Sequence, residues 1–219
     1  MVTRSSFHEQ LAALQRDLLR MGVFVSEAID KAVQSLAKLD IPAAQAVIAS
    51  DDTVDSMLID IEKRCLQLMA LQQPMAGDLR AIGTVLKIVT DLERMADHAT
   101  DIAKVTIRLE GETLIRKLVD IPFMARRVQE MTREALEAYV HRDVERAKRM
   151  IAMDDEIDDT YKRTFEFLLE TMQREPQHVR QATYLLLVAM YLERVGDHAT
   201  NLGEWTIYMV TGELKDMNA

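Results

Sequence analysis

The sequence predicts an all-α protein built as a tandem duplication of a three-helix bundle, with six long helices. Only 7 of the 219 residues are Gly and 4 are Pro, whereas strong helix formers dominate. No segment shows the alternating pattern of a strand. The stretch 92–103 recurs one hundred residues later as 192–203, with seven of twelve positions identical. We therefore expect one repeat over residues 1–110 and a second over 111–219.

Each helix can be placed from its apolar spacing and its boundary residues. The first helix of each repeat has apolar residues on one face, at Ala28, Ala32, Val33 and Leu36 and, 103 residues later, at Met131, Ala135, Leu136 and Tyr139. Asp40 and Asp120, each followed by Ile and Pro, predict N-caps of new helices. Pro74 and Pro176 mark the turns between the second and third helices, and Gly111 marks the turn between repeats.

These signals predict helices over 5–38, 42–72, 77–109, 120–141, 143–173 and 177–210. Segment 110–119 is compatible with a turn or with an extension of the fourth helix. The 14 Met residues are interpreted as flexible core filler among Leu, Ile and Val.

Charge and composition limit the possible partners and location. A net charge of −9 argues against nucleic acid, because binding phosphate backbones needs a basic stripe that this sequence lacks. The single Cys65 excludes an internal disulfide and is expected to be a buried thiol. The N-terminus has no apolar signal region, and no apolar run approaches the roughly 20 residues that span a bilayer. We expect a soluble cytoplasmic protein with no direct membrane insertion.

Acidic residues are the most informative part of the duplication. Glu93, Asp97 and Asp101 lie four apart on one face of the third helix, and the second repeat places Glu193, Asp197 and Asn201 at the same positions. The second helices carry a further matched pair at an offset of 103, namely Asp51 and Asp55 in one repeat and Asp154 and Asp158 in the other. Like charges at this spacing repel, so a positive group is expected against them.

A helical hairpin brings these pairs to the same height. Asp55 precedes Pro74 by 19 residues and Glu93 follows it by 19, while Asp158 and Glu193 lie 18 and 17 residues from Pro176. Four carboxylates in each repeat should therefore converge, and such oxygen ligands suit divalent cations. The alternative is a salt-bridge network or a solvated face, with Arg80 and Arg180, or Arg94 and Arg194, neutralising the acids.

His98 and His198 each follow an Asp of the acidic stripe by one residue, so they point about 100° away from it. We expect them to support neighbouring side chains or to pack. They also miss the Glu-x-x-His spacing of di-iron bundle proteins, because Ala96 and Gly196 occupy the required positions.

The doubled Leu-Glu-Arg-(Met/Val)-(Ala/Gly)-Asp motif and the doubled Asp-x-x-x-Asp motif resemble those of the PhoU family, from about Phe7 to Met209. The resemblance implies two three-helix bundles, a homodimer, and a cytoplasmic regulator linking a phosphate ABC transporter ATPase to a sensor histidine kinase. It also implies metal ions, whether iron, zinc, manganese, magnesium or nickel. The first site would use Asp51, Asp55, Glu93 and Asp97 with Asp101 close by, and the second Asp154, Asp158, Glu193 and Asp197 with Asn201 close by.

Three functions compete on the sequence. The leading one is a non-catalytic metal-binding adaptor that damps phosphate uptake, since no phosphate-binding Gly-rich loop or nucleophile and base set is recognisable. The alternative is a carboxylate-bridged metalloenzyme, an oxidase or a hydrolase with a metal-activated water. The third is a structural bundle that binds no metal, in which removing charge from Glu93 and Asp97 would leave stability unchanged or raise it.

Overall fold

The computed structural model describes residues 4–115 and 120–213, and these contain helices and their connections but no strand. The first repeat consists of α1 (Arg4–Lys38), α2 (Ile41–Gln72) and α3 (Ala76–Arg108). The second consists of α4 (Ile121–His141), α5 (Val144–Ile151), α6 (Asp154–Arg174), the 3-10 turn η1 (Pro176–His178) and α7 (Val179–Thr211). The all-α class is confirmed.

The predicted helix 143–173 is divided into α5 and α6 at Ala152 and Met153. Here the Met153 amide donates to the Met150 carbonyl at 2.9 Å, which is a tighter i to i−3 turn than an α-helix makes. Asp154 and two further acids then occupy the first turn of α6. Negative charge there is favoured by the helix dipole, so the break is compatible with the local sequence.

Both expected N-cap residues stand at the start of their helices, but only one of them caps with its side chain. The Asp40 carboxylate accepts from the Ala43 amide at 3.0 Å, whereas Asp120 makes no side-chain cap. The structural counterpart of Asp40 is Asp143, which accepts from the Arg146 amide at 2.9 Å at the start of α5. The expected turn at Gly111 is present, with a φ of 78° that favours glycine. A backward extension of the fourth helix over 116–119 lies outside the described residues.

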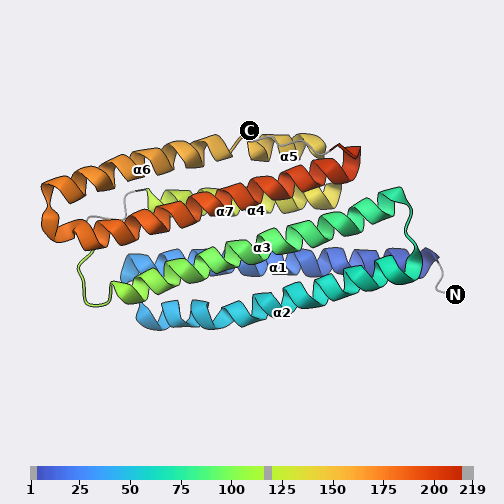
Figure 1. The fold of residues 1–219 in the computed structure, drawn as a ribbon, viewed down its shortest axis with the longest axis horizontal. Helices are drawn as coiled ribbons and strands as arrows, with labels where there is room; N and C mark the ends of the chain where they lie inside the picture. Colours follow the sequence, from blue (N-terminus) through green and yellow to red (C-terminus); the bar gives the residue numbers. More distant parts are fainter. Residues whose placement is uncertain (1–3, 116–119, 214–219) are drawn as a thin grey trace.

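The two repeats lie side by side, with α3 and α7 antiparallel along the middle (Figure 1). In this view α1 and α4 lie behind them, while α2 and α6 run along the two outer edges. The matched residues Leu92 and Leu192 are both fully buried in the core between these helices. Burying a leucine contributes roughly 1.5–3 kcal/mol, so the two central helices are anchored rigidly. Their outward faces carry the predicted acids. Within the described part of the chain, no helix combines the length and apolarity needed to cross a membrane.

Candidate metal centre

The four acids of the first repeat form one electrostatically coupled group. Burial raises the pKa of Asp51, and the charges of Asp97 and Asp55 raise it further. Burial also raises the pKa of Glu93, followed by the charges of Asp97, Asp55 and Asp51. Helices α2 and α3 thus bring the four side chains near one another, as the hairpin spacing predicts. We call this set the first acidic cluster: Asp51, Asp55, Glu93 and Asp97.

The second repeat builds the equivalent second acidic cluster from Asp154, Asp158, Glu193 and Asp197. Burial raises the pKa of Asp154 to about 7, with further contributions from Asp197, Asp158 and Glu193. The pKa of Glu193 is raised by burial and then by Asp197 and Asp158. Desolvation and the charge of Asp158 raise the pKa of Asp197, although this residue stays exposed at the surface. The matched motifs therefore produce the same repulsion twice.

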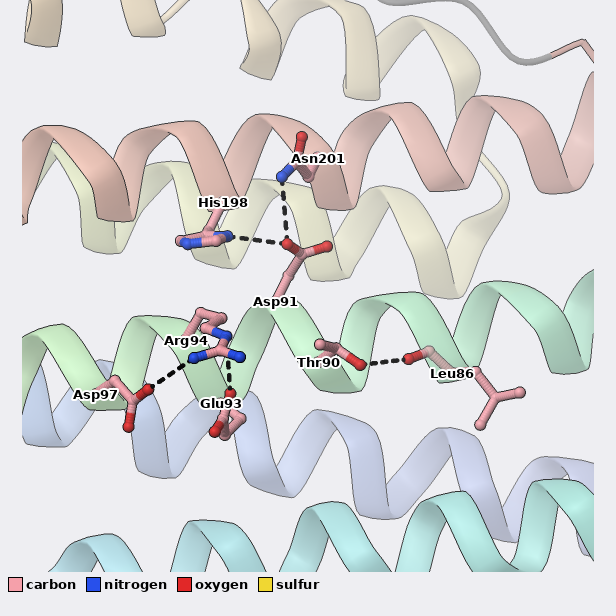
Figure 2. A network of polar contacts seen from close by, with 8 residues as sticks. All are labelled: Leu86, Thr90, Asp91, Glu93, Arg94, Asp97, His198 and Asn201. Atoms are coloured by element: carbon pink, nitrogen blue, oxygen red, sulfur yellow. Dashed lines mark hydrogen bonds and ion pairs between the residues drawn. The ribbon is translucent and has the colours of Figure 1, made fainter.

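The carboxylates of each cluster lie near one another but do not surround a common point. Among the residues that the structure describes, no three His, Cys, Asp or Glu side chains stand around a common point where an ion could sit. In the first cluster the Arg94 guanidinium lies 3.5 Å from Glu93 and 3.4 Å from Asp97 (Figure 2). Arg94 thus supplies part of the positive charge expected there, as the alternative to metal allows. A bound ion would require the carboxylates to turn inward.

Asp101 and Asn201 have partners outside the clusters. Asp101 accepts from Lys104 one turn along α3, at 2.9 Å. Asn201 donates to Asp91 at 3.2 Å across the junction of α3 and α7 (Figure 2). Neither residue contributes to the raised pKa values of the cluster acids. The structure therefore places both beside the predicted sites and engages them elsewhere.

His98 and His198 meet at the junction of the repeats, in a cleft that Asp97 and Asp197 also line. Their rings lie 5.8 Å apart, and His98 stacks on Tyr191 at 5.7 Å. Burial lowers the pKa of His98 to about 4, so its ring is neutral at pH 7. His198 Nδ1 lies 2.9 Å from Asp91 (Figure 2). Both rings thus have the packing and supporting role that the sequence favours, beside an open cleft of about 650 Å³.

Asp91 is the polar residue at this junction that the sequence analysis missed. Its counterpart at position 191 is Tyr, so a comparison of the two repeats passes over it. The single carboxylate binds two residues of α7, His198 and Asn201. It therefore joins the repeats to each other rather than serving one of them.

Arg180 does not neutralise the second acidic cluster, as one alternative allowed. Its guanidinium donates to the Arg108 carbonyl at the end of α3, at 2.8 Å, and pairs with Glu112. The guanidinium also lies over Tyr184. The matched Arg80 packs against Gly212, just past the end of α7. Each arginine therefore lies at the C-terminal end of the other repeat's third helix, where cations are favoured by the helix dipole.

The chemistry of the donor set fits a divalent cation. Each cluster offers four carboxylates from two rigid helices, and Mg²⁺, Mn²⁺ and bridged iron or zinc ions all accept such oxygen ligands. Burial and then the charges of neighbouring acids raise the pKa values of Glu93 and Glu193, so desolvation and like charge both oppose the ionised carboxylates. In the second cluster Asp154 also lies in space that a Cβ on residue 196 would otherwise fill. When bound, a metal would supply the missing positive charge.

Two helical bundles, each with an acidic stripe on its last long helix, α3 in the first and α7 in the second, define a class of duplicated helical-bundle proteins. The model of the PhoU domain matches the chain twice, over residues 18–106 and 121–206. The chain belongs to the PhoU family. One match falls in each predicted repeat.

Relatives of known identity match over nearly the whole chain. The phosphate-specific transport system accessory protein PhoU homolog of Clostridium acetobutylicum is 43% identical over 99% of this chain and 100% of its own. The homolog from Aquifex aeolicus is 39% identical over 94% of this chain and 93% of its own length. The crystal structure of PhoU from Pseudomonas aeruginosa superposes with a TM-score of 0.90 at 34% identity, covering 94% of this chain and all of that one. The family is non-catalytic, in agreement with the expectation that this chain is not an enzyme.

Proposed function

We propose that this chain is a metal-binding regulator of phosphate uptake and of the response to phosphate starvation. It would act in the cytoplasm as an adaptor between the ATPase of a phosphate ABC transporter and a sensor histidine kinase. The relatives named as phosphate transport accessory proteins support the pathway. The observation that supports the metal is the mutual coupling of four acids in each repeat.

Metal binding would change the charge and the geometry of both acidic clusters, and partner proteins could distinguish the metal-bound form from the metal-free form. Without a cation the like charges repel, and with one the carboxylates of two helices are drawn together. A bound ion stabilises the folded chain by mass action, so its loss would loosen each hairpin. The candidate ions are iron, zinc, manganese, magnesium and nickel, because oxygen donors alone do not select among them.

Complementation in the source bacterium tests this function. Deleting the gene should raise phosphate uptake and starvation-dependent transcription at high phosphate, and the wild-type chain should restore repression. The combined variant Asp97→Asn and Asp197→Asn should fold but fail to restore it. Asp52→Asn with Asp155→Asn is the matched control, because these acids belong to the same motifs and are exposed. Unchanged uptake and transcription after deletion would contradict the pathway role.

A second copy of the chain is the proposed assembly partner. An open groove of about 780 Å³ runs between α1 and α4, on the side away from the acidic stripes. Its α1 wall carries Glu27 and Asp30, and its α4 wall carries two arginines, Arg126 and Arg133, together with two acids, Glu130 and Glu137. A two-fold axis along the groove would bring Glu27 and Asp30 of each copy to the α4 wall of the other, where Arg126 and Arg133 are the candidate pairing partners.

A further inference from the structure

The two acidic clusters are built from matched motifs but differ at one backbone position. Residue 96 beside the first cluster is Ala, and residue 196 beside the second is Gly. A Cβ on Gly196 would stand 2.8 Å from Asp154 Oδ1, closer than such contacts are ever found. Gly196 has no positive φ that would require glycine, and glycine within a helix is less favourable than alanine. Its effect here is to make room for the Asp154 carboxylate.

With this space, the α6 acids of the second cluster lie deeper in the protein than their α2 counterparts in the first. Asp154 is only 8% exposed, whereas its counterpart Asp51 is partly exposed. Asp158 is likewise less exposed than Asp55. Asp197 is exposed, whereas its counterpart Asp97 is only partly exposed, so the second cluster is more buried than the first on its α6 side and more open on its α7 side. Attraction between a carboxylate and a cation strengthens as water is excluded, which favours an ion at this cluster.

The two clusters also differ in their ion pairs with the protein's own arginines. Arg94 pairs with both Glu93 and Asp97, so a metal entering the first cluster must compete with it. Its counterpart Arg194 is exposed, and within the described ranges no Lys, Arg or His pairs with Glu193. The charge of Arg194 acts on Glu193 only from a distance. A metal entering the second cluster would displace less.

We propose that the two metal sites are unequal, and that Gly196 makes the second cluster the tighter and earlier-filled site. This inference rests on the proposed metal-binding function. The second cluster holds a resident divalent ion low in water, while the first exchanges its ion with the surroundings. In such a regulator the metal would stabilise the α6–α7 hairpin permanently, while the α2–α3 hairpin would gain or lose its metal as the supply changes.

Titration of the chelator-treated full chain with Mn²⁺, with free Mn²⁺ followed by electron paramagnetic resonance, tests the inequality. The wild type should show two classes of site whose Kd values differ tenfold or more. Gly196→Ala should weaken the tight class by about tenfold, which corresponds to 1.4 kcal/mol. Ala96→Gly is the matched control in the first repeat and should leave the tight class unchanged. Asp154→Asn should abolish the tight class and leave the weak one.

Two further readouts separate a local effect from misfolding. Gly196→Ala should keep the far-ultraviolet circular dichroism and the metal-free melting temperature of the wild type within a few degrees. Water-proton relaxation should report fewer exchangeable waters on Mn²⁺ in the tight class than in the weak class. Equal affinities in the wild type, or a tight class that Gly196→Ala leaves unchanged, would overturn this inference alone. Absence of any Mn²⁺ binding by the wild type would overturn the proposed metal-binding function itself.

Discussion

Replacing Asp154 by Asn should stabilise the metal-free protein at pH 8. In the folded chain this carboxylate is 8% exposed and faces three other acids, and its pKa rises from 3.8 to about 7. The folded state therefore binds a proton more tightly than the unfolded state does. The stability associated with this group is fully present below about pH 4 and is lost as the pH rises to 7. Asn has the same shape and no charge, so it removes this loss.

The size of the effect follows from the shift in pKa. About three pKa units correspond to about 4 kcal/mol at pH 8. Asp154 is also the first residue of α6, so losing its charge there forfeits about 0.5–1 kcal/mol of interaction with the helix dipole. A net gain of about 3 kcal/mol is expected. The neighbouring Asp155→Asn is the control: it is exposed in the same turn and should lose about 0.5 kcal/mol.

Urea unfolding in the presence of chelator at pH 5 and pH 8 measures this prediction. The wild type should lose stability between the two pH values, and Asp154→Asn should lose markedly less. Addition of a bound divalent ion should reverse the order and make the wild type the more stable protein. A metal-free Asp154→Asn variant that is less stable than the wild type at pH 8 would refute the reasoning.

Three further predictions concern the scaffold. Arg180→Ala should lower the free energy of unfolding in urea by about 1 kcal/mol, because it leaves the Arg108 carbonyl without its donor. The control Arg174→Ala, at an exposed residue, should change that free energy by less than about 0.5 kcal/mol. Equal effects of the two variants would contradict a role of Arg180 in joining the repeats. Gly22→Ala should destabilise by about 1–3 kcal/mol because its Cβ would overlap Leu136 Cδ1, while Gly83→Ala, with open space around it, should stabilise by up to about 1 kcal/mol; a thermal melt that ranks them the other way would contradict this packing. In light scattering, Arg126→Glu should weaken a dimer and Asp30→Arg in the same chain should restore it; a dimer indifferent to both changes would exclude the α1–α4 groove as its interface.

The fold could be predicted from sequence because its signals are repeated. The order of the helices follows from the abundance of helix formers, from the matched apolar faces and from the prolines at the hairpin turns. Because the sequence is duplicated, each of these signals occurs twice. The division at Ala152 and Met153 could not be predicted, since both residues are compatible with a continuous helix. Asp120 begins α4 as its Asp-Ile-Pro pattern predicts, but the pattern does not reveal that its side chain makes no cap hydrogen bond, whereas Asp143, which lacks the proline, makes one.

Part of the candidate site could likewise be predicted from the sequence, and part could not. The grouping of acids within each repeat follows from helical spacing and hairpin height alone. Contacts between repeats do not, because they depend on how α3 packs against α7. The partners of Asp91, Asn201 and Arg180 all belong to this second kind. The meaning of Gly196 also needed coordinates, since only these place Asp154 against it.

Elemental analysis of the untagged chain, purified without chelator or nickel resin, tests the central claim most directly. The account predicts bound divalent or transition metal, with at least one ion for each acidic cluster. The combined variant Asp97→Asn and Asp197→Asn should lose this metal, and the exposed pair Asp52→Asn and Asp155→Asn should retain it. A wild-type chain that carries no metal and binds none on incubation with ferrous, zinc or manganous ions would contradict the account.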